Sequence, residues 1–563
     1  MIESTPPWAK KKFYFRPKLV DALRGYTPAK FFADLGAGLT VGVVALSLCI
    51  GLGIASGATP VAGLYTGIIG GFLISALGGS SVQIGGPAGA FVGLIALMVA
   101  QYGLADVLLC TMMAGGILFA LGALKLGSLI KFVPHPVTVG FTCGIAVTIF
   151  STQIHALLGL QLENEPAQFL PKMGALAAVL PSISWPTVAL ALVAVAIIVF
   201  WPKRWSRVPG SIVAVAAGML IVQFYHRLGW ATDTIGSKFG GIPQGLPSFH
   251  FPGLDLDHLS GLIRPAFTIA LLGAIESLLS AVVADGLIDG RHDSNQELMA
   301  QGAANFVAPL FGGLPATGVI ARTATNIRSG AATPVAGIIH SVVLLVVLLV
   351  AAPLFNDVPL ATLAAVLAVV AVRMGEWEEF ALLHKKPRGD AAVFLTTFGL
   401  TVLFDLTVAV EVGMVLAAFS FIKRVTDTTM IQAMTGEEAA LGGQGHEQVA
   451  NVPSGVMIYR VFGALLFGSA GKLESIIRRS GGETDVVILH LAAVTAMDAT
   501  ALNRVENLHE KLHRHGKHLI LSGPHTQPYF MMEKAGFFDA LGRENIAPDL
   551  EAAVARAREL LKK

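Results

Sequence analysis

The chain has 563 residues, of which 54% are hydrophobic and only 13% are charged, whereas soluble proteins carry roughly 25% charged residues. Its net charge of +2 gives no case for nucleic-acid binding. Its three cysteines lie in apolar runs, so they are expected as small core residues and not as a disulfide framework or a metal site. Charge is unevenly distributed, because the last 113 residues carry 26 charged side chains and the first 450 carry only 50. The composition therefore predicts a lipid-embedded part followed by an aqueous domain.

A cluster of basic residues between Lys10 and Lys18 precedes the first apolar run. No short hydrophobic segment with a cleavage site follows, so a cleavable signal peptide is not expected. From Leu35 to Ala105 the sequence contains no Asp, Glu, Lys or Arg. A stretch of this length accommodates about three membrane passes of about 20 residues each.

Apolar runs continue to residue 422 and form two sets of seven. The first set covers residues 33–56, 60–78, 88–101, 103–124, 137–159, 187–201 and 211–227. The second set covers residues 265–284, 299–312, 318–329, 333–353, 358–373, 391–404 and 407–422. A Pro/Gly-rich segment from Gly229 to Arg264 separates them. Basic residues precede the first run and follow the fourth, sixth, twelfth and fourteenth runs, which predicts that both termini lie in the cytoplasm. The sequence thus predicts an α-helical polytopic membrane protein with 14 transmembrane segments.

Two of these runs are too short to cross a bilayer. At a rise of about 1.5 Å per residue, Ala88 to Gln101 spans about 21 Å and Gly318 to Ser329 about 18 Å, against a hydrocarbon core of about 30 Å. Each is third in its set, and each follows a Gly/Pro breaker, at residues 85–87 and 312–315. Short, interrupted segments at matching places in two halves are typical of a transporter's midplane binding site.

The C-terminal part has a different pattern. Strands are predicted from Val456 to Val461, from Asp485 to Leu491 and from His518 to Ser522. Short helices are expected at residues 473–479 and around 502–512, and two more helices end the chain. Alternating strands and helices predict an α/β domain with a largely parallel sheet.

Several motifs resemble the signature of the SulP family, which contains sulfate permease-like anion transporters and exchangers. They are GLYT at 63–66 with QIGGP at 83–87, LGAIES at 272–277, and GGLPATG at 312–318 with ART at 321–323. The C-terminal part resembles the STAS domain of sulfate transporters and anti-sigma-factor antagonists. The resemblance covers residues 20–563. It implies that the segments form 7+7 inverted repeats, with a core of helices 1–4 and 8–11 moving against a gate domain, commonly in a homodimer.

In proteins of this family the anion lies between the N-termini of the third and tenth helices. Carried over by position, the resemblance implies a substrate site at Leu48, Leu52, Ala88, Gly89, Ile320 and Ala321. The start of the second short segment and the charge beside it add Gly318 and Arg322 to this site. Many members have Pro-Gln in place of Ser47-Leu48, and animal members often have Ser in place of Ala321. We therefore expect a less polar pocket here, in which backbone N–H groups contribute more of the binding.

Two ionisable residues lie in apolar surroundings. Arg322 follows Gly318 by four residues, and a charge at that depth costs at least about 2.5 kcal/mol. We interpret it as a source of positive field for the anion, and the alternatives are snorkelling or a pair with a local carboxylate. Glu276, with Ser280 on the same helix face, is interpreted as a proton-coupling group. Permanent pairing with Arg322, or a role as a sodium ligand, remains open.

Residues 498–501, Asp-Ala-Thr-Ala, stand where STAS domains often have Asp-Ser-Ser-Gly. The resemblance therefore aligns Thr500 with a position that is phosphorylated in the antagonists and leaves a cytoplasmic partner of this domain open. The favoured alternative is that Thr500 only caps the following helix.

We therefore expect a secondary active transporter of small anions of the sulfate, bicarbonate or dicarboxylate class. It would work by proton symport with alternating access, in the cell membrane (the inner membrane of a bacterium). Anion exchange, sodium-coupled bicarbonate transport and an anion channel with STAS-mediated signalling are the alternatives. The sequence shows no arrangement of residues typical of a hydrolytic or redox active site, so an enzyme is not expected. No cofactor or metal is expected either. The expected domains are a cytoplasmic segment (1–30), the transport domain (31–425), a linker (426–454) and the STAS domain (455–563).

Overall fold

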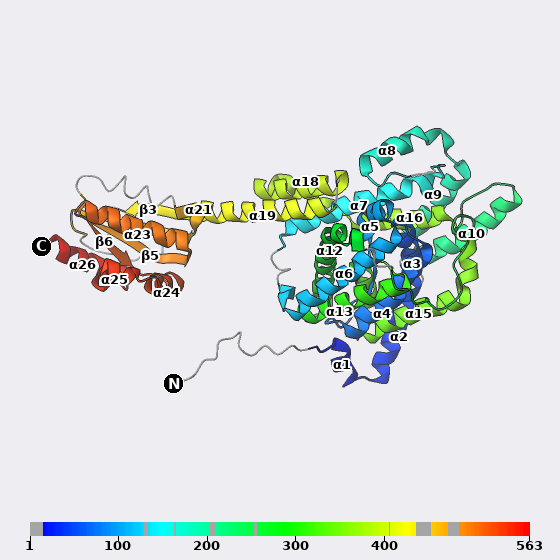
Figure 1. The fold of residues 1–563 in the computed structure, drawn as a ribbon, viewed down its shortest axis with the longest axis horizontal. Coiled ribbons are helices and arrows are strands. Elements are labelled where there is room, and N and C mark those ends of the chain that lie inside the picture. Colours follow the sequence, from blue (N-terminus) through cyan, green and yellow to red (C-terminus); the bar gives the residue numbers. More distant parts are fainter. Residues whose placement is uncertain are drawn as a thin grey trace. The chain divides into compact units, whose positions relative to one another are not determined.

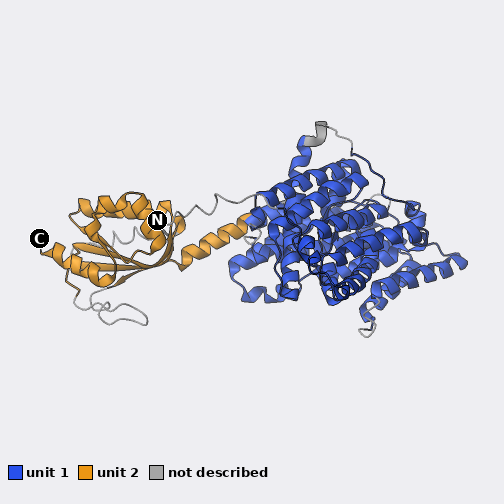
Figure 2. Cartoon of the chain, turned by 90° about the horizontal axis from the view of Figure 1, so that it is seen from below, with its two compact units in different colours: residues 1–414 blue, residues 415–563 orange. Residues whose placement is uncertain are grey.

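The computed structural model describes residues 15–128, 133–162, 165–202, 209–252, 256–404, 406–434, 452–470 and 484–562. The chain divides into two compact units, Met1–Met414 and Val415–Lys563, which are coloured separately in Figure 2. Three predicted features lie outside the described residues. They are Lys10 to Lys12 of the basic cluster, residues 435–451 of the expected linker, and the short helix expected at 473–479.

The described part of unit 1 is mainly helical (Figure 1). Its first half contains α1 (Lys18–Leu23), α2 (Pro28–Ala55), α3 (Pro60–Tyr65), a π-helical turn η1 (Thr66–Gly70), α4 (Gly71–Leu77), a 3-10 turn η2 (Gly89–Phe91), α5 (Val92–Tyr102), α6 (Leu104–Ala123), α7 (His135–Leu158), α8 (Phe169–Ala178), η4 (Leu180–Ser182), α9 (Trp185–Phe200) and α10 (Gly210–Arg227). The elements α3, η1 and α4 follow one another without a break and form one long helical segment.

The second half of unit 1 repeats this helical character. It contains α11 (Ile235–Phe239), α12 (Leu256–Ile288), α13 (Ser294–Val307), η6 (Ala308–Phe311), α14 (Ile320–Arg328), α15 (Val335–Ala351), η7 (Ala352–Asp357), α16 (Leu360–Met374), α17 (Glu378–Leu382), η8 (Leu383–Lys385) and α18 (Arg388–Leu403). The long helix α19 (Leu406–Thr428) crosses the boundary between the two units.

Seven helical segments among the described residues are long and apolar enough to cross a membrane. They are Pro28–Ala55, Pro60–Leu77, Leu104–Ala123, His135–Leu158, Ser260–Ile288, Val335–Asp357 and Leu360–Lys385. Two shorter apolar helices, Gly89–Tyr102 and Trp185–Phe200, accompany them. The remaining predicted runs also contain helices that are not among these segments, so the total of 14 spans stays a prediction.

Helix boundaries in unit 1 follow local sequence signals. Thr27 and Thr59 each precede a proline, and their side chains accept hydrogen bonds from Lys30 N and Ala62 N at the starts of α2 and α3. A threonine cap before a proline satisfies one orphan donor and sets the backbone for the first turn. At the other end of α7, Gly159 adopts a left-handed conformation with φ of 60°, which a glycine adopts without strain.

Helices α6 and α13 approach each other closely through a glycine. A methyl group at Gly115 of α6 would lie only 2.5 Å from the backbone nitrogen of Phe306 on α13. Only a residue without a side chain allows this contact, as is common where helices pack inside membranes. The closely packed pair α6 and α13 thereby supports the segments that precede β2.

Unit 2 contains a five-stranded sheet in the order β3-β4-β5-β6-β7. The strands are β3 (Met430–Met434), β4 (Val456–Leu465), β5 (Val486–Met497), β6 (His518–Ser522) and β7 (Ile546–Ala547). Strand β3 is antiparallel to β4, and the other neighbours are parallel. The predicted strand at His518–Ser522 is confirmed, whereas β3 was not predicted and lies within the segment expected to be a linker.

Helices cover both faces of this sheet (Figure 1). The helices are α21 (Phe467–Ala470), α23 (Ala499–Arg514), α24 (Thr526–Lys534), α25 (Phe537–Leu541), the 3-10 turn η10 (Arg543–Asn545) and α26 (Leu550–Leu561). One buried cluster joins the sheet to α23, α24 and α25 through Val505, Met532 and Phe538. A second cluster joins it to α26 through Leu550 and Val554. The predicted α/β domain with a largely parallel sheet is therefore present.

Candidate anion-binding site

The two Gly/Pro breakers pair with each other. Gly85–Pro87 forms β1 and Ala316–Gly318 forms β2, and the two strands are antiparallel, with Gly85 opposite Gly318 and Pro87 opposite Ala316. Every residue of both strands is buried. We call this pair the β1–β2 ribbon. A short helix begins just after each strand, so the antiparallel ribbon joins the two short helical segments, and their starts lie at its opposite ends.

Each helix start has an extended residue before it. Ala88 precedes η2 with φ of −117° and ψ of 146°, and Val319 precedes α14 with φ of −105° and ψ of 112°. Neither residue has a side chain that caps the helix. The first N–H groups of both helices therefore lack an intrahelical partner and carry partial positive charge, which suits them to an anion.

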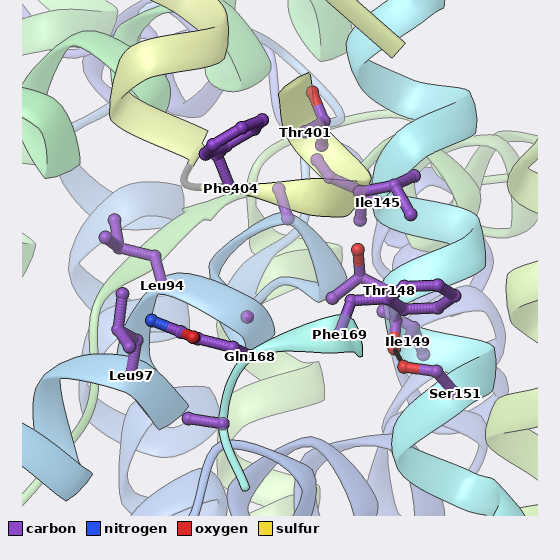
Figure 3. Close-up of a pocket in the computed structure, with 14 residues that line it drawn as sticks. Leu94, Leu97, Ile145, Thr148, Ile149, Ser151, Gln168, Phe169, Thr401 and Phe404 are labelled. Atoms are coloured by element: carbon purple, nitrogen blue, oxygen red, sulfur yellow. Dashed lines mark hydrogen bonds between the residues drawn. The ribbon is translucent and has the colours of Figure 1, made fainter. Parts of the chain in front are cut away.

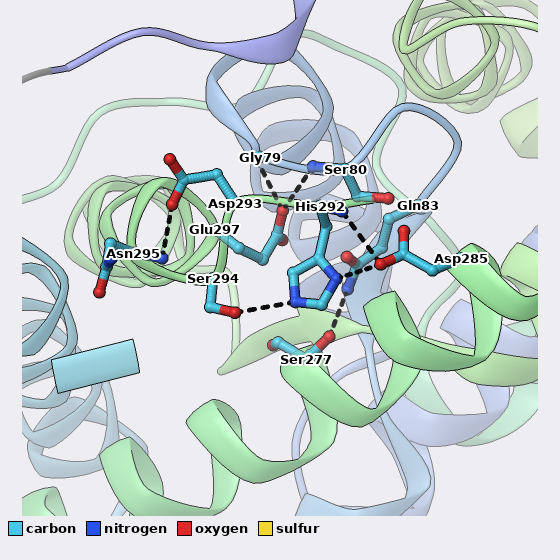
Figure 4. Close-up of polar contacts among 10 residues, drawn as sticks. All are labelled: Gly79, Ser80, Gln83, Ser277, Asp285, His292, Asp293, Ser294, Asn295 and Glu297. Carbon is cyan, nitrogen blue, oxygen red and sulfur yellow. Dashed lines mark hydrogen bonds and ion pairs between the residues drawn. The ribbon is translucent and has the colours of Figure 1, made fainter. Parts of the chain in front are cut away.

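Helix α12 holds the ribbon through hydroxyl groups. The Ser277 Oγ accepts a hydrogen bond from Gly318 N at 3.2 Å and lies 2.6 Å from the Thr317 Oγ1. Gln83, which precedes β1, donates from Nε2 to the Ser277 carbonyl at 3.0 Å (Figure 4). Ser280, which was expected beside the coupling carboxyl, instead donates to the Thr323 Oγ1 at 3.3 Å. Its hydroxyl thus helps to fix α14 against α12.

A buried carboxylate that the sequence analysis missed holds the loop before β1. The Glu297 Oε2 accepts hydrogen bonds from Gly79 N at 2.9 Å and from Ser80 N at 3.2 Å (Figure 4). Gln301 donates to its other oxygen at 2.9 Å. A single acidic residue inside the otherwise neutral helix Ser294–Val307 is the signal that could have indicated this role.

The turn between α12 and α13 carries a chain of polar contacts beside this loop (Figure 4). The His292 Nδ1 lies 2.7 Å from the Asp285 Oδ2, and the His292 Nε2 lies 2.9 Å from the Ser294 Oγ. His292 N also donates to Asp285 Oδ2 at 3.0 Å. These contacts fix the turn that presents Glu297 to the loop.

Arg322 is buried and connects the two helix starts. It lies on α14 and is 2% exposed, and its Nη2 donates to the Pro87 carbonyl at 3.1 Å, just before the first short helix. A methyl group at Gly86 would lie 2.5 Å from the Arg322 Nη1, so this position must stay small. Within the described chain, Nε and Nη1 have no hydrogen-bond partner. A carboxylate partner, which was the alternative interpretation, is not found among these residues.

Glu276 lies on α12, one residue before Ser277, and is partly buried. Its Oε2 is shielded from solvent and has no hydrogen-bond partner in the part of the chain that the structure describes. Glu276 and Arg322 do not form an ion pair, so permanent pairing between them is not the arrangement seen here. A carboxyl group without a partner is suited to gaining or losing a proton.

The predicted lining residues fall into two groups. Leu52 and Ala88 are buried in one hydrophobic cluster, against which Leu48 packs. A methyl group at Gly89 would lie 2.7 Å from the Ile149 Cδ1 of α7. In contrast, Ile320 is 39% exposed and Ala321 is also exposed at the start of α14. The wall from the first half is therefore apolar and closed, whereas the start of α14 is accessible.

Two cavities in the described part of unit 1 lie near these helices. A small one of about 40 Å³ is lined by residues of α5, α7 and α18, including Leu94, Ile149 and Thr401 (Figure 3). A larger one of about 310 Å³ is lined by the C-terminal part of α2 and by α5, α7, α8 and α16. None of the predicted substrate-site residues lines either cavity. The larger cavity contains His155, Glu165 and Lys172, which the sequence analysis did not assign to a site.

In unit 2, Thr500 does not cap α23. The cap is Asp498, whose Oδ1 accepts from Ala501 N at 2.8 Å and whose Oδ2 accepts from Phe467 N at 2.8 Å. The favoured interpretation of Thr500 is therefore wrong, because the carboxylate two residues earlier already satisfies the helix start. Thr500 itself is exposed in the first turn of α23.

Comparisons with known proteins agree with this architecture. The model of the sulfate permease family matches residues 31–397, and that of the STAS domain matches residues 447–553. The chain is 42% identical over 527 residues to YvdB of Bacillus subtilis (strain 168), covering 93% of this chain and 97% of YvdB. It is 30% identical to the bicarbonate transporter BicA of Picosynechococcus sp., covering 93% and 94%. Its fold matches the inward-facing murine anion transporter Slc26a9 with a TM-score of 0.86, 18% identity and coverage of 99% and 97%.

Proposed function

The chain belongs to the sulfate permease family, and from this premise we propose that it carries a small anion together with a proton across the membrane. Membership makes it an anion transporter and not an enzyme. Beyond family membership, we propose where the anion binds, which ion is coupled to it and how transport proceeds. The central observation is the buried β1–β2 ribbon, in which each strand is followed directly by a short helix.

The ribbon supports an anion site without a dedicated cationic ligand. Each helix start contributes about half a positive charge, and the guanidinium of Arg322 adds a full charge from behind the ribbon. In a low-dielectric environment this field attracts an anion strongly. We therefore assign anion binding to the N–H groups after Ala88 and Val319, and attraction of the anion to Arg322.

Glu276 is the proposed proton carrier. Before the anion arrives, the two helix starts and Arg322 favour its ionised form. An arriving anion adds negative charge and favours the neutral, protonated carboxyl. Anion and proton would then each increase the other's affinity, which is the thermodynamic requirement for symport.

The remaining parts of the proposal concern substrate, assembly and location. We propose sulfate, bicarbonate and small dicarboxylates as the substrate class, because one relative is named as a bicarbonate transporter and the family is named after sulfate permeases. We further propose a homodimer in the cell membrane, with 7+7 inverted repeats, both termini in the cytoplasm, and alternating access through motion of a core against a gate. The STAS domain would regulate transport and contribute to assembly.

Uptake into proteoliposomes tests the function. Purified full-length protein is reconstituted, and labelled sulfate, bicarbonate and succinate are offered with an inward proton gradient, an inward sodium gradient or neither. The proposal expects accumulation driven by the proton gradient for at least one anion. Accumulation that requires sodium would replace proton coupling with sodium coupling. Exchange without accumulation would identify an exchanger, and passive conductance alone would identify a channel.

A further inference from the structure

The larger cavity of unit 1 has two walls of different chemistry. The wall formed by α2, α5 and α16 consists of glycine and aliphatic residues, among them Gly51, Ala55, Val99 and Leu363. The wall formed by α7, α8 and the segment between them supplies the polar side chains, which are Thr152, Gln153, His155, Glu165 and Lys172. An apolar cavity with a few convergent polar groups is typical of a small-molecule site.

The charged residues of the polar wall contact one another. The Lys172 Nζ lies 3.1 Å from the Glu165 Oε1, and the His155 Nδ1 lies 2.8 Å from the Glu165 Oε2. The Lys172 side chain is only 4% exposed, whereas those of His155 and Glu165 are 37% and 24% exposed. A buried ammonium is costly unless negative charge lies beside it. The cavity therefore contains a cation whose counter-charge is a partly exposed carboxylate.

The net charge of this cluster depends on His155. Burial opposes the ionisation of Glu165, but the neighbouring His155 and the charge of Lys172 outweigh burial and hold its pKa below the usual value. Glu165 therefore stays ionised over the range of about pH 5 to 8 in which imidazoles ordinarily titrate. The net charge of the three side chains is then zero when the imidazole is neutral and +1 when it is protonated.

The other elements around the cavity add no charged side chain to this cluster. Among the described residues that line it, α2, α5 and α16 contribute no charged or titratable side chain. The C-terminal ends of α2, α5 and α7 border the cavity and add partial negative charge. This field disfavours an anion, so an anion needs additional positive charge in order to be retained.

We propose that this cavity is a second anion site, in which Lys172 provides the binding charge and protonation of His155 admits the anion. The site is separate from the β1–β2 ribbon and does not require that the ribbon site carry the transported ion. By linkage, anion and proton bind to the cavity cooperatively. Two opposite unit charges about 6 Å apart across a partly wet cavity give a change on the order of tenfold in anion affinity.

Equilibrium binding of [³⁵S]sulfate to purified full-length protein tests this site at about pH 6 and about pH 8. In the wild type we expect a class of sites that binds about tenfold more tightly at the lower pH. His155→Gln should remove the pH dependence and leave weak binding. Glu165→Gln should give tight binding at both pH values, because Lys172 then lacks its counter-charge. Binding that is unaffected by either substitution belongs to another site.

Further variants control for folding and position. Lys172→Met should abolish the pH-dependent class, and Lys172→Arg, which keeps the charge, should retain it. His226→Gln changes an exposed histidine outside the cavity and should behave as wild type. The proposal is wrong if Lys172→Met retains the class, if Glu165→Gln weakens it, or if wild-type binding shows no pH-dependent class. This assay measures binding and not transport. Loss of uptake in variants of the two helix starts would therefore count against the ribbon site and not against the cavity site.

Discussion

Gly318 is the last residue of β2, and adding one methyl group there tests the ribbon site. A methyl group at position 318 would lie 2.5 Å from Cδ of Gln83 and would overlap its amide nitrogen. That amide donates to the Ser277 carbonyl, and Gly318 is the residue opposite Gly85 in the ribbon. Gly318→Ala must therefore displace either the Gln83 side chain or the strand itself.

The size of the effect follows from these contacts. Leaving a buried hydrogen-bonding group without a partner costs about 1–3 kcal/mol, and overpacking a buried site costs typically about 1–3 kcal/mol more. Even the lower end of the combined range, about 2 kcal/mol, corresponds to roughly a 30-fold loss of kcat/KM if it distorts the helix starts in the transport cycle.

The assay compares initial uptake rates in proteoliposomes for four proteins. We expect Gly318→Ala to lose at least about 30-fold in kcat/KM, while Gly116→Ala, where a methyl group meets no atom within 4 Å, behaves as wild type. Gln83→Ala removes the obstructing amide, so the double variant should recover part of the loss. The reasoning is refuted if Gly318→Ala matches Gly116→Ala, or if the double variant is no better than Gly318→Ala alone. Size-exclusion profiles separate misfolding from loss of transport.

Four further predictions concern other parts of the chain. Arg322→Gln should raise the KM for the anion by roughly 10- to 100-fold, from the loss of one charge behind the site, while assembly is unchanged. Aggregation of that variant would instead support a purely structural role. Uptake should rise as external pH falls below neutral, and Glu276→Gln should still exchange anion but lose accumulation driven by a pH gradient. Unchanged pH dependence in this variant would exclude Glu276 as the coupling group. Glu297→Gln should lower the unfolding free energy by about 1–3 kcal/mol, because either the two loop N–H groups or the Gln301 amide loses its acceptor, and an unchanged thermal midpoint would contradict the role of this carboxylate. Deletion of residues 451–563 should leave residual uptake but change the rate or the oligomeric state, and an unaltered protein would remove the case for regulation by this domain.

The broad plan of the molecule could be predicted because it depends on composition and breakers. The fall in charge before residue 450 and its rise afterwards reflect two solvents, and each short helix is preceded by Gly and Pro. The pairing of β1 with β2 could not be predicted in the same way. Three-residue strands show no periodicity, and the partners, at Gly85 and Gly318, are separated by most of the transport domain.

Side-chain partners were the least predictable feature. Lys172 is the single charged residue of α8, and nothing in the sequence beside it indicates its partner, yet its side chain is buried beside Glu165 of the preceding segment. In the STAS domain, Asp498 and Thr500 are both acceptable caps by residue type, and only the backbone path shows which one meets the Ala501 N–H. Arg322 was predicted to lie near the helix starts, but its hydrogen bond to the Pro87 carbonyl follows from tertiary structure alone.

The antiparallel register of the ribbon also constrains how the sequence can vary in length. Inserting or removing a single residue within Gly85–Pro87 would turn every later residue of that strand to its opposite face. The same holds for Ala316–Gly318, whose partners in the ribbon are the buried residues Gly85, Gly86 and Pro87. These two distant segments must therefore keep matched lengths, and a deletion in one is tolerated only if the other is shortened at the corresponding position.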